Sequence, residues 1–500
     1  MTTASNERGR RSWGSPLGWI AALQILMTLV ALGRAKILAV MLSPSGFGVA
    51  ATIDQLIMTV VQLGALGMPF ASLKYMAQAH GEGQGQFQRV ATGFAKAILM
   101  AGLLSTLILL LILQFRPEWI GRELTPYLSY LKVAALCVPA AMLAILAANT
   151  LAAAQRPVGA AMMNFAVAFA LAAGAVIGVA LDGLNGLYAG TAIAGLLSTV
   201  GAGLFLFRDV GVRWVMGRRG EGGLAEALRH FPASAGFYLT MVLSAGSLFL
   251  IRYLVLAHMG EAPAGFFQSG MSIALTAGAV LTPLINLYLI PILSRRAPTT
   301  DKVAACERFM MSLLPVMILA VIPILCFPQT IIRILYTDQF TPAAYILFSF
   351  VLWQCLTQIS YICLQLLIGL DDLVSVPVLA LIGFGGSALL TELLLPRMGL
   401  IGAPAAMTLG MALYAGAILV RLKWKHGVSL TPQIHGRVAW MMVVIAAGGV
   451  LFMRGAEFSL TGFGARALFA TICLALTWLI FLRNDTATLA LVRRFTGRRA

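Results

Sequence analysis

A succession of long apolar runs, from near residue 17 to residue 482, limits what this chain can fold into. A run of about 18 or more apolar residues is long enough to cross a bilayer as a helix. The bilayer core permits only helices or closed barrels, because every backbone polar group must be satisfied internally. Barrel strands alternate inward and outward residues over about 10 positions, whereas these runs are continuous. The sequence therefore predicts an all-α membrane protein.

About 14 transmembrane helices are predicted, in groups of six, six and two. The first six cover about 17–40, 49–72, 91–114, 128–153, 158–181 and 184–207. The second six cover about 231–257, 264–293, 308–327, 342–368, 373–395 and 400–420. The last two cover about 438–453 and 464–482.

These groups define the expected domains. Residues 1–207 form an N-terminal six-helix lobe, and 208–230 form a basic cytoplasmic connector. Residues 231–420 form a C-terminal six-helix lobe and 438–482 an extra helix pair. Residues 483–500 form a basic cytoplasmic tail.

The basic residues follow the connections between spans. The net charge is +17, which raises the question of nucleic acid. With the N-terminus inside, however, 24 of the 35 lysines and arginines fall on inside segments and five in outside loops. Such an asymmetry is typical of membrane orientation. We therefore expect both termini in the cytoplasm and no nucleic-acid partner.

A repeated pattern indicates that the two lobes are copies. Arg34 precedes Gly46-Phe47-Gly48 by 12 positions, and Arg252 precedes Gly265-Phe266-Phe267 by 13. In the first copy a Pro/Gly turn at 43–48 separates two apolar segments, and Asp54 lies in the second of them. An apolar run ending at Pro283 follows in the second copy.

A further match supports the duplication. The segment 186–192 (GLYAGTA) aligns with 399–405 (GLIGAPA), and each begins the sixth helix of its group. Six crossings return the chain to its starting side, so the copies should be parallel repeats. This arrangement is typical of transporters, with the substrate site between the repeats and alternating access by rocking.

Charges inside spans mark the candidate site. A mid-bilayer charge costs about 2.5–3.5 kcal/mol on insertion scales. Arg34 and Arg252 hold matching repeat positions, and two guanidiniums can grip a phosphate or pyrophosphate. Lys36 is a weaker candidate for the same role, and it lies on another helix face from Arg34. Lys36 and Lys132 can instead snorkel to outer headgroups.

Asp54 leaves two interpretations open. It is either the structural ion-pair partner of Arg34 or Lys36, or a proton or cation site for coupling.

Other chemistry has no support in the sequence. A phosphate-binding GxxxxGK[ST] loop is absent, so the chain is not its own ATPase. The five histidines and six cysteines lack ligand spacing, and we expect neither a metal, a cofactor nor a catalytic residue. Asp371-Asp372 looks like a glycosyltransferase metal pair in isolation, but we interpret it as a solvated turn between two spans.

The chain resembles the polysaccharide transporter branch of the multidrug/oligosaccharidyl-lipid/polysaccharide exporter superfamily, which contains O-antigen-type oligosaccharide flippases. The resemblance rests on the order of weak motifs along nearly the whole chain: 34–42, Gly46-Phe47-Gly48, 64–67, 332–336 and 399–403. It implies two lobes in the inner (plasma) membrane. It also implies flipping of undecaprenyl-pyrophosphate-linked oligosaccharide from the cytoplasmic to the periplasmic leaflet, for O-antigen, lipopolysaccharide or exopolysaccharide biosynthesis.

The resemblance extends to residues and partners. Arg34 and Arg252, and more weakly Lys36, match basic cavity residues that meet the pyrophosphate. The pair 438–482 corresponds to helices that form a lipid-tail groove in lipid II flippases. The expected partners are the lipid-linked oligosaccharide, a coupling ion (H⁺ or Na⁺) and polysaccharide polymerase machinery.

Two alternatives stay open. A cation-coupled multidrug exporter has the same fold, although such exporters usually stop at twelve helices. A polytopic polysaccharide polymerase or ligase belongs to another class. Such enzymes place a large polar loop outside, whereas the longest polar connector here, 208–230, is predicted inside.

Overall fold

The computed structural model describes residues 16–211, 231–279, 281–282, 285–295, 297–452, 457 and 459–479. Within these ranges the secondary structure is helical and contains no strand. The predicted cytoplasmic tail, most of the connector 208–230 and Pro283 lie outside the described residues.

The chain separates into two compact units. The first comprises residues 1–42 and 53–242, and the second comprises residues 43–52 and 243–500. Each unit is described by itself. The lobe boundaries expected at 207 and 231 stay predictions.

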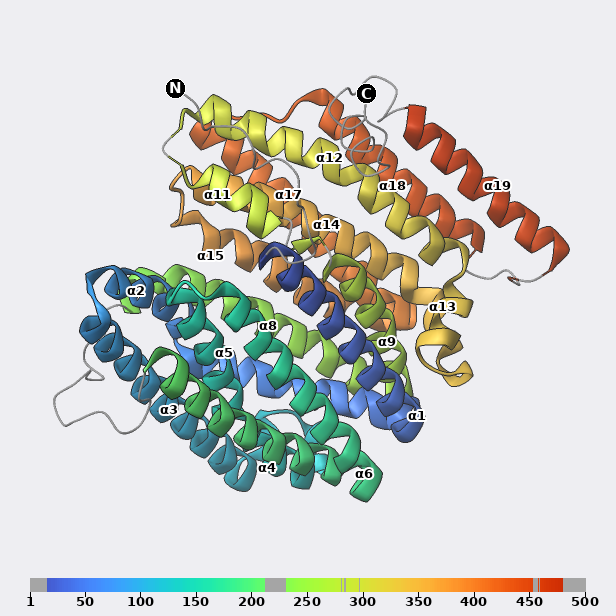
Figure 1. The fold of residues 1–500 in the computed structure, drawn as a ribbon. Coiled ribbons are helices and arrows are strands. Elements are labelled where there is room, and N and C mark those ends of the chain that lie inside the picture. The colour runs from blue at the N-terminus through green and yellow to red at the C-terminus, as the bar shows by residue number, and fades with distance from the viewer. Residues whose placement is uncertain are drawn as a thin grey trace, which may run out of the picture. The chain divides into compact units, whose positions relative to one another are not determined.

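The first unit is built mainly from six α-helices, coloured from dark blue to green in Figure 1. They are α1 (Pro16–Ala65), α2 (Met68–Glu82), α3 (Gln84–Phe115), α4 (Leu128–Ala135), α5 (Cys137–Ala153) and α6 (Pro157–Val210). Two short 3-10 helices, η1 (Pro117–Trp119) and η2 (Arg122–Tyr127), join α3 to α4.

The second unit contains the remaining helices of the described residues. They are α8 (Phe231–Met259, whose first residues still belong to the first unit), α9 (Glu261–Ala279), α11 (Ile290–Leu293), α12 (Thr299–Cys326), α13 (Pro328–Leu335), α14 (Ala344–Gly369), α15 (Ser375–Ala380), α16 (Gly386–Met398), α17 (Gly402–His426), α18 (Pro432–Phe452) and α19 (Leu460–Thr477). Short η segments lie at Ile285–Leu289, Asp338–Ala343, Leu381–Gly385 and Gly399–Ile401.

The helices have the length and composition of membrane spans. Eight described helices are long and apolar enough to cross a bilayer, or nine if the bent pair α4 and α5 counts as one span. Three of the eight extend over 48 to 52 residues. At 1.5 Å per residue each measures more than about 70 Å, over twice the hydrocarbon thickness. Each therefore contains two crossings, and with the shorter α9 and α19 the fold agrees with about 14 spans.

Single breaks divide these long helices where the sequence predicts turns. In α6 the break falls at Asp182 and Gly183, and between α16 and α17 it falls at Gly399, whose φ is 66°. In α1 it falls at Ser43 alone, with φ 58° and ψ 176°. The predicted turn over 43–48 was too long: Pro44 already begins the second arm, because its fixed φ suits a first helical turn.

The span predicted at 128–153 is bent by 42° between α4 and α5. Pro139 explains the bend, because proline has no N–H to donate to the carbonyl of Ala135 four residues earlier. The hydroxyl of Thr106 on α3 lies 3.3 Å from that carbonyl and shares its single hydrogen between it and the carbonyl of Gly102, at 2.9 Å. The carbonyl freed by Pro139 therefore has a polar neighbour inside the unit.

Close helix contacts occur at glycines. A Cβ atom on Gly383 would lie 2.7 Å from the Tyr414 side chain, and one on Gly410 would overlap Ser387. The close approach predicted for the segment 383–387 is therefore confirmed. Within the span predicted at 264–293, the structure describes helix over Glu261–Ala279, and a π-helical turn at Ile285–Leu289 leads into α11.

The extra helix pair packs within the second unit. In Figure 1, α18 and α19 lie beside α12, and both contact it. Glu457, between them, is 3% exposed and accepts hydrogen bonds from the backbone N–H groups of Gln329 and Thr330 at 2.6 and 2.9 Å. It thereby caps the start of α13. Arg466 on α19 is buried over the ring of Phe452, at 5.1 Å.

Candidate functional site

A cavity of about 240 Å³ lies inside the first unit. Its walls come from both arms of α1, from α4 and α5 around the Pro139 bend, and from the two arms of α6. Most of the lining is small or apolar, and the polar side chains gather on one side. The lining residues are Arg34, Asp54, Ile57, Met58, Ala134, Cys137, Ala140, Ala141, Ala144, Val167, Leu171, Tyr188, Thr191 and Gly195.

The two charged residues of the cavity come from opposite arms of α1. Twenty residues separate Arg34 from Asp54, and the break at Ser43 turns the second arm back (Figure 1). The Arg34 guanidinium donates to the Asp54 carboxylate at 3.5 Å. Their side chains remain 32% and 44% exposed. The pair is therefore long and accessible, which keeps both charges available to a ligand.

Tyr188 completes this polar group. It is 3% exposed on the second arm of α6, and its hydroxyl is hydrogen-bonded to the Asp54 side chain. Asp54 thus has two donors, a phenol and a guanidinium. Thr191, one turn further along α6, donates to the carbonyl of Leu187 at 2.7 Å, so its hydroxyl is already occupied.

Arg34 has hydrogen-bonding capacity to spare. Its Nε is buried and has no acceptor among the described residues. A guanidinium carries five N–H donors in a planar fork that matches phosphate and carboxylate oxygens. The cavity can consequently take an anionic group at Arg34, and it can take a proton or small cation at Asp54.

The other predicted site residues lie elsewhere on the helices. Lys36 is exposed, on a different face of α1 from Arg34, as the two-residue spacing predicts. Arg252 on α8 belongs to the second unit, is 8% exposed, and donates to the carbonyl of Ala51 at 2.6 Å. Ala51 lies in the short 43–52 segment of the same unit. The structure thus brings Arg34 to Asp54, and it gives Arg252 a buried position at a backbone carbonyl.

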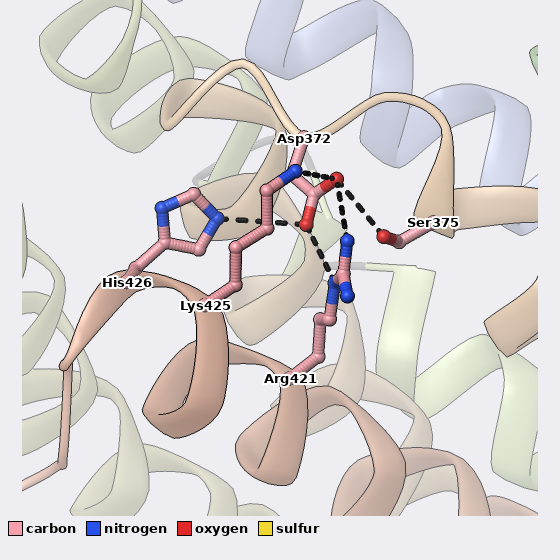
Figure 2. A network of polar contacts seen from close by, with 5 residues as sticks. All are labelled: Asp372, Ser375, Arg421, Lys425 and His426. Atoms are coloured by element: carbon pink, nitrogen blue, oxygen red, sulfur yellow. Dashed lines mark hydrogen bonds and ion pairs between the residues drawn. The ribbon is translucent and has the colours of Figure 1, made fainter.

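A second charged group surrounds Asp372, in the turn between α14 and α15. Figure 2 shows its carboxylate between the side chains of Arg421, Lys425 and His426 at the end of α17. Arg421 Nε lies 2.8 Å and Lys425 Nζ 2.7 Å from the carboxylate oxygens, and the Ser375 hydroxyl donates at 2.9 Å. His426 Nε2 is 3.5 Å away.

The prediction of a solvated turn at Asp371-Asp372 was therefore half wrong. Asp371 is exposed, but the side chain of Asp372 is fully buried. Burial alone raises the pKa of a carboxyl group, but hydrogen bonds from Arg421, Lys425 and Ser375 outweigh that effect. The net result is a pKa of Asp372 well below its usual range. We interpret this cluster as an ion-pair network that fixes the turn to α17.

Metal coordination has no candidate in the described part of the chain. No three His, Cys, Asp or Glu side chains come together there as a metal site requires. The six cysteines are free thiols, five of them buried, and Cys137 lines the cavity.

Sequence reasoning missed Tyr188 and Cys137 as cavity residues. Tyr188 lies within the GLYAGTA motif, which was recognised only as a repeat signal. A lone tyrosine among small residues at a helix start was the available clue, since a buried phenol usually finds a polar partner. Cys137 gave no signal, because its spacing matches no thiol motif.

Comparisons with known proteins agree with this architecture. No protein-family model matches the chain. The lipid III flippase of Escherichia coli (strain K12) is 26% identical over 331 residues, covering 65% of this chain and 77% of that protein. The lipid III flippase of Shigella flexneri gives the same figures.

Solved structures extend the similarity to most of the chain. The lipid II flippase MurJ, in an inward closed conformation, matches with a TM-score of 0.64 over 96% of this chain and 99% of its own, at 12% identity. An inward-facing multidrug resistance MATE family transporter of the MOP superfamily matches with a TM-score of 0.61, over 86% of this chain and 98% of its own, at 14% identity. The chain has the MOP-superfamily fold.

The MOP fold accounts for the main features described above. The chain is a multi-pass membrane protein, and its relatives are flippases and transporters. Its similarity to MurJ covers nearly the full length of both chains.

Proposed function

We propose that this protein is a flippase for a lipid-linked oligosaccharide of the undecaprenyl-pyrophosphate type. It carries the molecule from the cytoplasmic to the periplasmic leaflet of the inner membrane by alternating access, without covalent chemistry. The observation that carries this proposal is the half-exposed Arg34 guanidinium in a membrane-embedded cavity, with an unused buried Nε. The sequence relationship to lipid III flippases supports the substrate class.

The cavity suits an anionic headgroup because Arg34 is held loosely. A carboxylate at 3.5 Å neutralises the arginine at rest, and the exposed portion of each side chain allows an incoming phosphate to replace it. Charge-assisted hydrogen bonds of this kind are worth about 1.5–3 kcal/mol each. Arg252 and Lys36 are further contributors to headgroup binding, Arg252 by exchanging the Ala51 carbonyl for a phosphate oxygen.

Asp54 gives the transport step a way to couple to ions. A proton or Na⁺ on its carboxylate cancels the charge that holds Arg34, and the guanidinium is then free for the headgroup. Ion binding and substrate binding therefore favour each other. The polymer that results belongs to O-antigen or exopolysaccharide biosynthesis, where polymerase machinery receives the flipped unit.

A second candidate function rests on the apolar lining of the same cavity. Alanine, leucine, isoleucine and methionine dominate its walls, and one carboxylate faces them. Such a surface also suits a cation-coupled exporter of amphipathic drugs. A deletion strain with normal surface polysaccharide but raised drug sensitivity identifies this function.

The test is complementation of a deletion strain. Arg34→Ala, Arg252→Ala and the double variant should lower surface polysaccharide, and the double variant most, by about 10–100-fold if one or two charge-assisted hydrogen bonds are lost. Arg34→Lys keeps the charge but loses the planar fork, so it should restore function only in part. Arg397→Ala, on α16, is the control arginine variant. Normal polymer in the double variant at normal protein level contradicts the assignment of both arginines.

A further inference from the structure

The two arms of α6 enclose a second, apolar cavity of about 440 Å³. Unlike the charged cavity, it has no ionisable side chain in its lining. Every lining residue belongs to α6: Gly159, Met162, Met163, Ala166, Val167, Ala170, Leu197, Ser198, Gly201, Ala202 and Phe205. We call this space the α6 groove.

Glycines explain why the arms diverge. Near the Asp182–Gly183 break, a Cβ atom on Gly178 would overlap the carbonyl of Gly186, and one on Gly174 would lie 2.5 Å from the carbonyl of Gly190. Backbone there touches backbone. Toward the other end of the same hairpin, a Cβ atom on Gly201 would meet nothing within 4 Å. The arms are thus closed at the break and open toward Pro157 and Arg208.

The groove continues from the charged cavity. Val167 lines both spaces, and Leu171 and Gly195 of the charged cavity lie within one turn or so of groove residues. A ligand with its anionic group at Arg34 can therefore lay an attached apolar chain along α6. The groove has room for the first part of such a chain: a cavity of about 150 Å³ holds a benzene ring, so about 440 Å³ takes about three groups of that size. Exposed lining such as Met162 and Leu197, 57% and 68% exposed, gives the chain an exit into the bilayer.

We propose that the α6 groove binds the polyprenyl chain of the lipid whose phosphate is held at Arg34. This inference rests on the proposed function and adds the position of the lipid tail. It places that tail in the N-terminal half, whereas the sequence resemblance suggests the helix pair 438–482.

The position has a consequence for transport. In the orientation that the positive charges predict, the open end of the α6 groove faces the cytoplasmic side. A lipid with its headgroup at Arg34 and its tail in the groove then points tail-inward, as a lipid of the outer leaflet does. The lipid therefore reverses its orientation across the membrane while it is bound, before the headgroup leaves the cavity.

Photocrosslinking tests this proposal. The probe is undecaprenyl pyrophosphate with a diazirine on one of the isoprene units nearest its pyrophosphate, added to the full-length protein in nanodiscs. Crosslinked peptides should map to 159–170 and 197–205. Unlabelled undecaprenyl pyrophosphate should compete, whereas dioleoyl phosphatidylglycerol should not. Gly201→Trp fills the open end and should lower the yield about tenfold, equivalent to about 1.4 kcal/mol of binding.

Gly416→Trp is the matched control. Gly416 is exposed on α17, near the corresponding place of the twelfth span, and a Cβ atom there also meets nothing within 4 Å. Its crosslinking should stay at the wild-type level. The wild-type map is informative even if Gly201→Trp fails to fold.

Other outcomes overturn the proposal. Crosslinks confined to 432–477 contradict tail binding in the α6 groove but agree with the flippase function. Equal competition by phosphatidylglycerol shows a site for bulk lipid only. Absence of any competed crosslink rules out tail binding in the groove. If crosslinks map to the groove but deletion of the gene leaves surface polymer unchanged, the lipid site is supported and the flippase function is contradicted.

Discussion

The Arg34–Asp54 pair and the Asp372 cluster contain the same kinds of ion in different surroundings. The first is one contact of 3.5 Å between side chains that are 32% and 44% exposed. The second is a fully buried carboxylate with a guanidinium and an ammonium at 2.8 and 2.7 Å, on side chains that are 39% and 44% exposed. An accessible pair contributes about 0–1 kcal/mol to stability, whereas a buried carboxylate depends strongly on its partners. The comparison indicates that the loose pair serves binding and the tight cluster serves the fold.

The largest expected effect follows from removing the cations of the tight cluster. Arg421→Ala with Lys425→Ala leaves the Asp372 charge buried without its two ion-pair partners. We expect a loss of about 2 kcal/mol, below the roughly 3–5 kcal/mol of a wholly buried pair, because the two cations are 39% and 44% exposed and water can reach the carboxylate once they are removed. Thermal unfolding in detergent or nanodiscs measures it as a lower Tm. Adding Asp372→Asn should recover part of the loss, since the stranded charge is then gone.

Lys423→Ala is the control for this experiment, because Lys423 is exposed on the same helix end. It should leave the Tm unchanged. A double variant as stable as the control would show that the cluster does not stabilise the fold.

The loose pair should behave in the opposite way. Asp54→Asn removes the charge that competes for Arg34 and keeps the shape of the side chain. We expect inorganic pyrophosphate to bind about tenfold more tightly, a gain of about 1.4 kcal/mol. Isothermal titration calorimetry on the purified protein measures this change. The same variant should alter stability by less than about 1 kcal/mol.

Arg34→Ala provides the matching control, since it should abolish the gain when combined with Asp54→Asn. Weaker pyrophosphate binding in Asp54→Asn alone would mean that the carboxylate positions Arg34 instead of competing for it.

The smallest effect concerns pH. The folded-state pKa of Asp372 is lowered, so its stabilisation is fully present above the unfolded value of about 3.9. It is lost only as the pH falls below that value toward the folded one. The Tm difference between wild type and Asp372→Asn should therefore not shrink between about pH 7 and pH 5, and it should shrink below about pH 4. A difference that already shrinks between pH 7 and pH 5 contradicts the buried cluster.

Local patterns in the sequence predicted most of the fold. Apolar runs located the helices, the Pro/Gly turn located the break at Ser43, and the gaps between apolar runs located the breaks at Asp182 and Gly399. Arg34 and Asp54 stood out because charges are rare within spans. Their separation by a single break made an encounter plausible without any long-range information.

Long-range contacts explain what sequence reasoning could not supply. The partners of Asp372 lie 49 and 53 residues away, on a helix whose return path only the fold reveals. An acidic dipeptide between two spans looks the same whether it is solvated or buried. The α6 groove could not be predicted for a related reason. The sequence does not distinguish a glycine in close backbone contact from a glycine that faces open space.

The break at Ser43 has a mechanical consequence. Asp54 lies eleven residues beyond it, about 16 Å along the second arm at 1.5 Å per residue. A pivot of about 10° at that residue would displace the carboxylate by roughly 3 Å, close to the whole length of its contact with Arg34. The length of the Arg34–Asp54 contact would therefore report a change of angle between the two arms of α1 at Ser43.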